Sequence, residues 1–148
     1  MARRVSKKAE KKYVFDTNVF IELFRGYREE IRDFFVGIER KNRVTTVINL
    51  MELYEGAKSV GKAEIDKVDD FIRGEGVKIV PITKRASHRA IELMRKYTPT
   101  QGLEAKDAFI AAVCLEKNYI LVTMDNIFEK LKPEGLEVIR PIDLEGDK

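Results

Sequence analysis

Short apolar runs rich in β-branched residues alternate along this chain with longer segments of helical period. This alternation restricts the fold more than any other feature. The runs with strand character are residues 13–16, 43–47, 77–80, 119–123 and 136–139. Strands that alternate with helices form crossover units, which build a parallel sheet covered by helices on both faces. The sequence therefore predicts an α/β fold of three layers, α/β/α, around a central and mostly parallel sheet of about five strands.

The segments between these runs carry apolar side chains at helical spacing, most clearly in residues 31–38, 65–72 and 86–97. Glycine and proline are expected to separate the elements, because both residues interrupt regular structure. On this argument Gly56 and Pro99 should lie between elements. No internal repeat or long linker divides the chain, so residues 13–148 are expected to form one domain.

Composition excludes several classes of protein. The chain has 148 residues, of which 44% are hydrophobic and 36% charged, and no apolar run approaches the ~20 residues that a membrane helix needs. Its basic N-terminus is not followed by the apolar segment of a signal peptide. Cys114 is the single cysteine, which rules out an internal disulfide and a paired-cysteine zinc site. We expect a cytoplasmic protein that does not contact membranes.

Positive charge is concentrated at the N-terminus. Residues 1–12 contain six lysines and arginines against one acid, whereas the rest of the chain has a net charge of −2. We expect residues 1–12 to form a basic, flexible arm. Such an arm is either simply solvated or attracts the phosphates of an RNA, and the sequence leaves both interpretations open.

Four acidic residues occupy positions that demand an explanation. Asp16 closes the first predicted strand and Asp125 follows the fourth, so both belong at the carboxyl edge of the sheet, where α/β proteins bind ligands. Glu52 lies early in the helix after the second strand. Asp107 opens a helix that continues with eight apolar residues, which places it near the protein interior.

If these four carboxylates converge, their charge must be compensated. Two carboxylates about 4 Å apart repel by roughly 4 kcal/mol at an effective dielectric constant near 20, and a whole domain is stable by only about 5–15 kcal/mol. Protonation or a bound cation would remove the conflict. Oxygen ligands without histidine or cysteine favour Mg²⁺ or Mn²⁺ over zinc.

Each acid also has a purely structural interpretation. Glu52 follows Asn49 by three residues, the spacing of a capping box. Asp107 would be favourable at the positive end of its helix, and Asp125 could serve as a turn or capping residue. Asp16 could cap a helix only if that helix begins directly after it.

Three segments of the sequence resemble the PIN domain family, and in particular its VapC ribonuclease toxins. They are "VFDTNVFIELFRG", "TVINLMELYEG" and "DAFIAAVCLEKNYILVTMDNIFEKL". The segments occur in the order and approximate spacing of that family, and the likeness extends from about residue 13 to residue 141. The last segment is the most specific, because it joins an aspartate-opened, alanine-rich helix to a strand that ends in Thr-x-Asp.

The resemblance implies a set of functional residues. The acidic quartet of the family falls on Asp16, Glu52, Asp107 and Asp125. Its polar companions, which would orient the acids by hydrogen bonds, fall on Thr17, Asn18 and Thr123. None of the four acids departs from the family pattern.

The resemblance also implies an activity and partners. Proteins of this type are endoribonucleases that use one or two Mg²⁺ or Mn²⁺ ions, are commonly dimeric, and are held inactive by a cognate antitoxin protein. Independently of the resemblance, most of the aromatic residues in the first third of the chain are expected to be core, and some to form an exposed apolar groove between the first helices that receives the antitoxin or a second copy. These residues are Phe15, Phe20, Phe24, Phe34, Phe35 and Tyr54.

Other functions remain as alternatives. The chain could be a free-standing RNA-processing PIN nuclease, or a PIN-derived RNA-binding or scaffold module without catalysis. A phosphotransfer enzyme of the haloacid dehalogenase kind would need a second aspartate at position 18, where this chain has Asn18. A ribonuclease driven by two imidazoles is excluded, because His88 is the only histidine.

Overall fold

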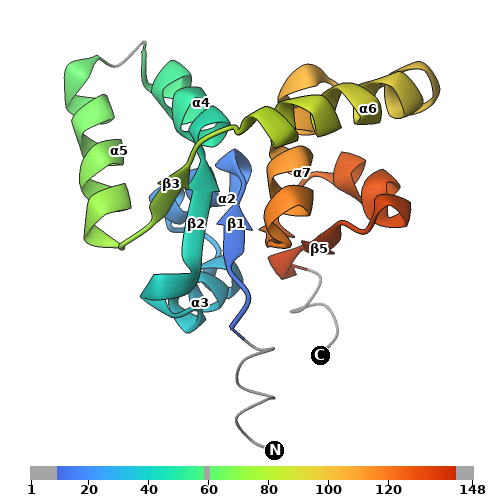
Figure 1. Ribbon diagram of the computed structural model, residues 1–148. Helices are drawn as coiled ribbons and strands as arrows, with labels where there is room; N and C mark the ends of the chain where they lie inside the picture. The colour runs from blue at the N-terminus through green and yellow to red at the C-terminus, as the bar shows by residue number, and fades with distance from the viewer. Residues whose placement is uncertain (1–9, 59–60, 143–148) are drawn as a thin grey trace, which may run out of the picture.

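The computed structural model describes residues 10–58 and 61–142, and it contains a five-stranded sheet with the order β3-β2-β1-β4-β5 (Figure 1). Every neighbouring pair of strands in this sheet is parallel. The strands are β1 (Tyr13–Phe15), β2 (Arg43–Thr46), β3 (Lys78–Val80), β4 (Ile120–Val122) and β5 (Glu137–Ile139). Each strand lies within its predicted range, so the α/β class and the parallel sheet are confirmed.

Helices connect the strands and cover the sheet on both faces (Figure 1). The α-helices are α2 (Thr17–Arg25), α3 (Glu29–Gly37), α4 (Val47–Ala57), α5 (Lys62–Gly74), α6 (Lys84–Gln101) and α7 (Ala105–Lys117). Two 3₁₀ segments complete the described chain, η1 (Arg40–Asn42) and η2 (Asn126–Glu134). The three helical stripes predicted from apolar spacing correspond to α3, α5 and α6.

Two hydrophobic cores lie on opposite faces of the sheet, because successive strand residues point to opposite sides. On β1, Val14 belongs to the core beneath α6 and α7, whereas Phe15 belongs to the core beneath α2, α3 and α5. The second core is aromatic, and Phe15 packs edge-to-face on Phe35 with ring centres 5.0 Å apart. This confirms the three-layer arrangement.

Two glycine and proline positions differ from the prediction. Gly56 lies in the last turn of α4, and Pro99 lies inside the last turn of α6, which ends at Gln101 and is capped by Gly102. A proline there removes one backbone hydrogen bond near the end of a long helix. The buried Tyr97 and the Gly102 N–H bond to the Thr98 carbonyl (3.0 Å) fix the helix end despite that loss.

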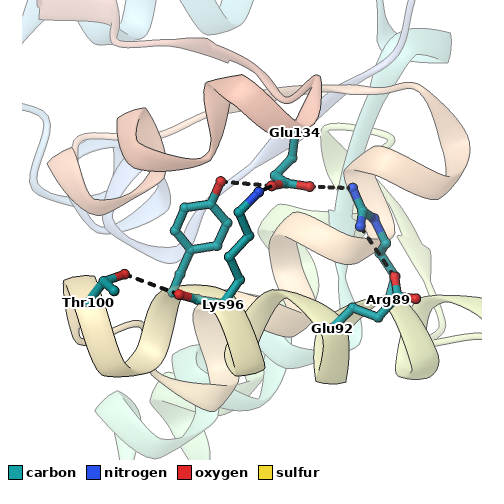
Figure 2. A network of polar contacts seen from close by, with 6 residues as sticks. Arg89, Glu92, Lys96, Thr100 and Glu134 are labelled. Carbon is teal, nitrogen blue, oxygen red and sulfur yellow. Dashed lines mark hydrogen bonds and ion pairs between the residues drawn. The ribbon is translucent and has the colours of Figure 1, made fainter.

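Glu134, at the end of η2, fastens this segment to α6 (Figure 2). Its carboxylate accepts a hydrogen bond from the Tyr97 hydroxyl (2.7 Å) and pairs with Lys96 (2.9 Å) and Arg89 (3.0 Å). The Glu134 side chain is only 13% exposed. The hydrogen bond from Lys96 is the largest of the effects that lower the pKa of Glu134 to about 2.

The chain is already attached to the sheet before β1 begins. The Lys12 carbonyl accepts a hydrogen bond from the Ile120 N–H (3.0 Å), and Lys11 pairs with Glu137. The prediction of a flexible basic arm concerns mainly residues 1–9, which lie outside the described residues. Within residues 10–58 and 61–142, no helix is both long and apolar enough to cross a membrane.

Candidate active site

Asp16 stands at the carboxyl end of the central strand β1 and is only 6% exposed. Its N–H continues the sheet by bonding to the Val122 carbonyl (2.9 Å). Its side chain accepts a hydrogen bond from the Thr17 N–H (2.9 Å) and so caps α2. The helix does begin directly after Asp16, so the capping interpretation describes part of its role.

A helix cap needs only one hydrogen bond to the carboxylate, yet the Asp16 carboxylate accepts two more from side chains. Asn49 donates its amide N–H to Oδ1 (2.9 Å), and the Thr123 hydroxyl donates to Oδ2 (2.6 Å). These donors come from α4 and from the end of β4, and they fix the carboxylate in one orientation. Burial nevertheless raises the pKa of Asp16 above its usual range, and the nearby charge of Glu52 adds to the rise.

Asn49 is a site residue that the sequence analysis did not identify as one. It is fully buried, and it forms a reciprocal capping box with Thr46 at the start of α4. The interpretation of Glu52 as the capping partner of Asn49 is therefore wrong. The helix begins at Val47, so Asn49 itself occupies the third helical position and Thr46 is the cap.

Glu52 lies one turn further along α4 and is connected to Asp16 through Thr17. The Thr17 hydroxyl donates to Glu52 Oε1 (2.6 Å) and accepts from the Asn49 amide (3.0 Å). The other oxygen of Glu52 pairs with the Lys106 ammonium (3.0 Å). Thr17 thus holds one oxygen of Glu52 in a fixed direction.

Asp107 lies in the first turn of α7 and is 9% exposed. Burial, followed by repulsion from Asp16 and Asp125, raises the pKa of Asp107 to about 7, while Lys106 opposes the rise. This repulsion shows that the three aspartates share one electrostatic environment. The helix after Asp107 is buried along its length, as its apolar sequence predicts.

Asp125 is exposed and caps η2 by accepting a hydrogen bond from the Ile127 N–H (3.1 Å). Its own N–H donates to the Thr123 hydroxyl (3.0 Å), the same hydroxyl that holds Asp16. The Asn18 side chain accepts from the Met124 N–H (3.1 Å) and thereby positions the loop that carries Asp125. Each of the three predicted polar companions thus forms a hydrogen bond to one of the acids or to the backbone next to it.

The four predicted acids therefore meet at one edge of the sheet through shared hydrogen bonds and mutual repulsion. Their oxygen donors have the chemistry that a hard divalent cation requires. Among residues 10–58 and 61–142, no three histidine, cysteine or acidic side chains are already arranged as a metal-binding group. The hydrogen bonds explain this, because Asp16, Glu52 and Asp125 direct oxygens to protein donors.

The remaining reactive side chains lie elsewhere. His88 lines a separate cavity of about 480 Å³ between α6 and α7. Cys114 is buried within α7, and burial raises the pKa of its thiol, which keeps it protonated. Neither side chain hydrogen-bonds to the four acids in the described part of the chain.

Comparison with known proteins relates this arrangement to a family. The model of the PIN domain matches residues 13–133. Similar solved structures include a toxin–antitoxin complex from Klebsiella pneumoniae (TM-score 0.70, 24% identity, 88% of this chain and 98% of that one). Another is VapBC-1 from nontypeable Haemophilus influenzae (0.72, 21%, 88% and 98%). A third is VapBC2 from Rickettsia felis bound to a promoter DNA fragment (0.70, 22%, 86% and 96%). At these identities the structures show a shared fold, and no curated protein gives a significant match.

Proposed function

The chain belongs to the PIN domain family, whose members are nucleases, and we propose that it is a metal-dependent endoribonuclease that acts as the toxin of a VapBC-type toxin–antitoxin pair. Its substrate would be the phosphodiester backbone of RNA. The observation that carries this proposal is the surroundings of Asp16, which is buried, held by Thr17, Asn49 and Thr123, and placed beside other acids.

The four acids would have different roles in metal binding, according to how deeply each is buried. Asp16, Asp107 and Asp125 would hold one or two Mg²⁺ or Mn²⁺ ions, with Glu52 in support. When bound, the cation supplies positive charge that activates water and stabilises the charge that develops on the phosphate oxygens. Asp16 and Asp107 are buried and would fix its position, whereas Asp125 is exposed and faces the solvent side from which RNA arrives.

The hydrogen-bonded side chains keep these carboxylates in place during the reaction. Thr123 holds Asp16 and the backbone of Asp125 at once, so a single hydroxyl sets the spacing of two acids. Without a cation the acidic edge repels RNA phosphates. The proposal therefore implies that RNA binds at this edge only when the divalent cation is present.

Cleavage of RNA with and without the metal tests the proposal. We expect hydrolysis in Mg²⁺ or Mn²⁺, none in excess EDTA, and a loss of at least about 10³-fold in Asp16→Asn. Asp70→Asn is the matched control, because Asp70 is 74% exposed on α5 and pairs with Arg73. Full activity of Asp16→Asn, or equal cleavage in EDTA, would reject the assignment. Binding of RNA without cleavage would instead favour the non-catalytic PIN module.

An antitoxin partner is proposed from two observations. The similar structures named above are toxin–antitoxin complexes, and an open groove of about 400 Å³ lies between α2 and α5, lined by Leu23, Phe24, Glu64, Lys67, Val68 and Phe71. Phe24 is 44% exposed and packs edge-to-face on Phe71. Exposed aromatic rings in a groove suit the apolar face of a helical partner segment.

This part of the proposal has its own test. The proposal requires that a neighbouring gene encode a small protein that binds the chain and inhibits cleavage, and Phe24→Ala should weaken that binding about tenfold or more. Cleavage by free Phe24→Ala should remain normal. Unchanged affinity in this variant would exclude the groove, and the absence of any inhibitory neighbour would favour a free-standing RNA-processing nuclease.

A homodimer and a cytoplasmic location complete the proposal. Sedimentation of the purified chain at micromolar concentration tests for the homodimer, and a purely monomeric profile would contradict it. The exposed apolar residues Met51, on α4, and Ile91, on α6, are 59% and 55% exposed and are candidates for contact between copies.

A further inference from the structure

The ion pair between Lys106 and Glu52 is the one feature of the site that the proposed mechanism does not use. Lys106 Nζ lies 3.0 Å from Glu52 Oε2, while the other oxygen of Glu52 is held by the Thr17 hydroxyl. Lys106 directly precedes Asp107 at the start of α7, and Glu52 belongs to α4. The pair thus joins the two helices that carry half of the acidic quartet.

Charge at this position acts on more than one acid. The hydrogen bond and charge of Glu52 raise the pKa of Lys106, to which Asp107 also contributes. In turn, Lys106 opposes the rise in the pKa of Asp107. The Lys106 ammonium therefore contacts Glu52 directly and also affects the charge of Asp107.

We propose that Lys106 is a positioning residue that serves as an internal counter-ion, occupying Glu52 in the metal-free protein and competing with the divalent cation for that carboxylate. The inference rests on the proposed function, because it concerns the metal that this function requires.

The geometry suits a displaceable counter-ion. The Lys106 side chain is 53% exposed, whereas that of Glu52 is only 21% exposed. A lysine ammonium is a flexible point charge that can leave for solvent at little cost, and an exposed ion pair is worth only about 0–1 kcal/mol. A divalent cation that enters must approach this positive charge or displace it, which lowers the affinity of the site for metal.

Substitution by the uncharged Lys106→Met, which keeps most of the side-chain volume, separates these effects. We expect it to bind Mn²⁺ about 3–10 times more tightly than the unchanged protein, measured by titration calorimetry and by the electron paramagnetic resonance of free Mn²⁺. Its melting temperature in EDTA should fall, and the rise in melting temperature on adding Mn²⁺ should grow. Both readouts are independent of RNA cleavage.

Two further variants control for net charge and for side-chain packing. Lys106→Arg keeps the positive charge and should restore the original Mn²⁺ affinity. Lys41→Met makes the same change in net charge at the opposite end of the sheet, just before β2, and should leave the affinity unchanged. A gain shared by Lys106→Met and Lys41→Met would overturn the inference, because it would reflect net charge alone.

The outcomes also distinguish this inference from the proposed function. If the unchanged protein binds no divalent cation, the proposed function fails and the inference fails with it. If the unchanged protein binds Mn²⁺ but Lys106→Met binds it equally or more weakly, only the role of Lys106 is overturned. Weaker binding would mean that the ammonium holds Glu52 in the pose that the metal needs.

Discussion

The strand pair β1–β2 has one buried charged side chain at each end, and the surroundings of these two side chains differ in charge. At the carboxyl end, Asp16 is 6% exposed and lies among like charges. At the amino end, Arg43 is 5% exposed, and its guanidinium is surrounded by carbonyl and carboxylate oxygens. Burying either charge costs desolvation free energy. At the amino end, the partners of Arg43 offset this cost, whereas at the carboxyl end the partners of Asp16 do not offset it fully.

Arg43 is bound by the ends of two helices. Its guanidinium donates to the carbonyls of Ile38 (3.0 Å) and Glu75 (2.9 Å), which close α3 and α5, and it also pairs with the Glu75 carboxylate (3.2 Å). The guanidinium carbon lies 4.4 Å from the centre of the Phe35 ring. Helix C-termini carry partial negative charge, so this position stabilises a cation.

Asp16 also has well-placed donors, yet its pKa is raised, because burial and Glu52 outweigh them. A buried charge that the fold alone does not compensate indicates a site shaped for something other than stability. The amino end of the sheet therefore compensates its buried charge within the fold, whereas the carboxyl end holds a carboxylate whose charged form the fold disfavours, as the proposed metal site would require. This contrast can be tested by removing each charge in turn.

The largest expected effect is on cleavage by Asp107→Asn. We expect activity to fall at least about 10³-fold, because the amide cannot provide the charge of the carboxylate. The metal-free protein should nevertheless become more stable at pH 8, by about 1–2 kcal/mol, because repulsion among the acids is relieved. Denaturant unfolding in EDTA measures this gain. A loss of stability would show that the fold compensates the charge of Asp107 to the same degree as the charge of Arg43.

The same acid sets a pH dependence for the metal-free protein. The pKa of Asp107 is raised from 3.8 to about 7 in the folded state, so the folded state binds more protons than the unfolded state between these values. Its contribution to stability is present below pH 4 and is lost as the pH rises to about 7. Asp107→Asn should flatten this decline in urea unfolding between pH 5 and pH 7.5. An equal decline in both proteins would assign it to another group.

The sequence predicts the acids of this site better than it predicts what holds them. Asp16 and Asp125 could be placed together because strand ends in a parallel sheet share an edge, which follows from local patterns of apolar residues. Asn49 could not, because its contact with Asp16 joins residues 33 positions apart in the chain. In the sequence it fits equally well as an ordinary capping residue, and it does take part in the capping box of α4 as the partner of Thr46.

Lys106 escaped prediction for a related reason. A lysine at the start of a helix is usually solvated, and nothing local indicates that Glu52 lies across from it on α4. The predictions for Pro99 and Gly56 were wrong for a different reason. Both residues were expected to interrupt regular structure, but tertiary packing keeps them inside helices. The fold thus follows from periodicity and the acidic quartet from the family resemblance, whereas the pairing of polar side chains depends on how the helices pack.

The amino end of the sheet supplies the next largest effect. Arg43→Met should lower the free energy of unfolding by about 2–4 kcal/mol, because buried carbonyls at two helix ends lose their donor. Cleavage per folded molecule should be unchanged. Arg40→Met is the matched control, since Arg40 makes one exposed bond, to the Gly74 carbonyl, and it should cost less than about 1 kcal/mol. Lost activity in folded Arg43→Met would contradict the division between the two ends.

The smallest expected effect concerns Glu134, a carboxylate that, unlike Asp16, has its charge compensated by cations (Figure 2). Glu134→Gln should reduce stability by about 1 kcal/mol at pH 7, because the amide keeps hydrogen bonds but loses both ion pairs.

The pH dependence of this loss distinguishes the charge of Glu134 from its packing. The pKa of Glu134 is lowered from 4.5 to about 2, so its contribution is present above pH 4.5 and disappears as the pH falls towards 2. The difference between the unchanged protein and Glu134→Gln in chemical unfolding should therefore shrink over that interval. Glu92→Gln serves as the control, because Glu92 is 67% exposed and pairs with Arg89 at the surface. A difference that stays constant down to pH 2 would show that Glu134 acts through shape, and that compensated charge adds nothing to this part of the fold.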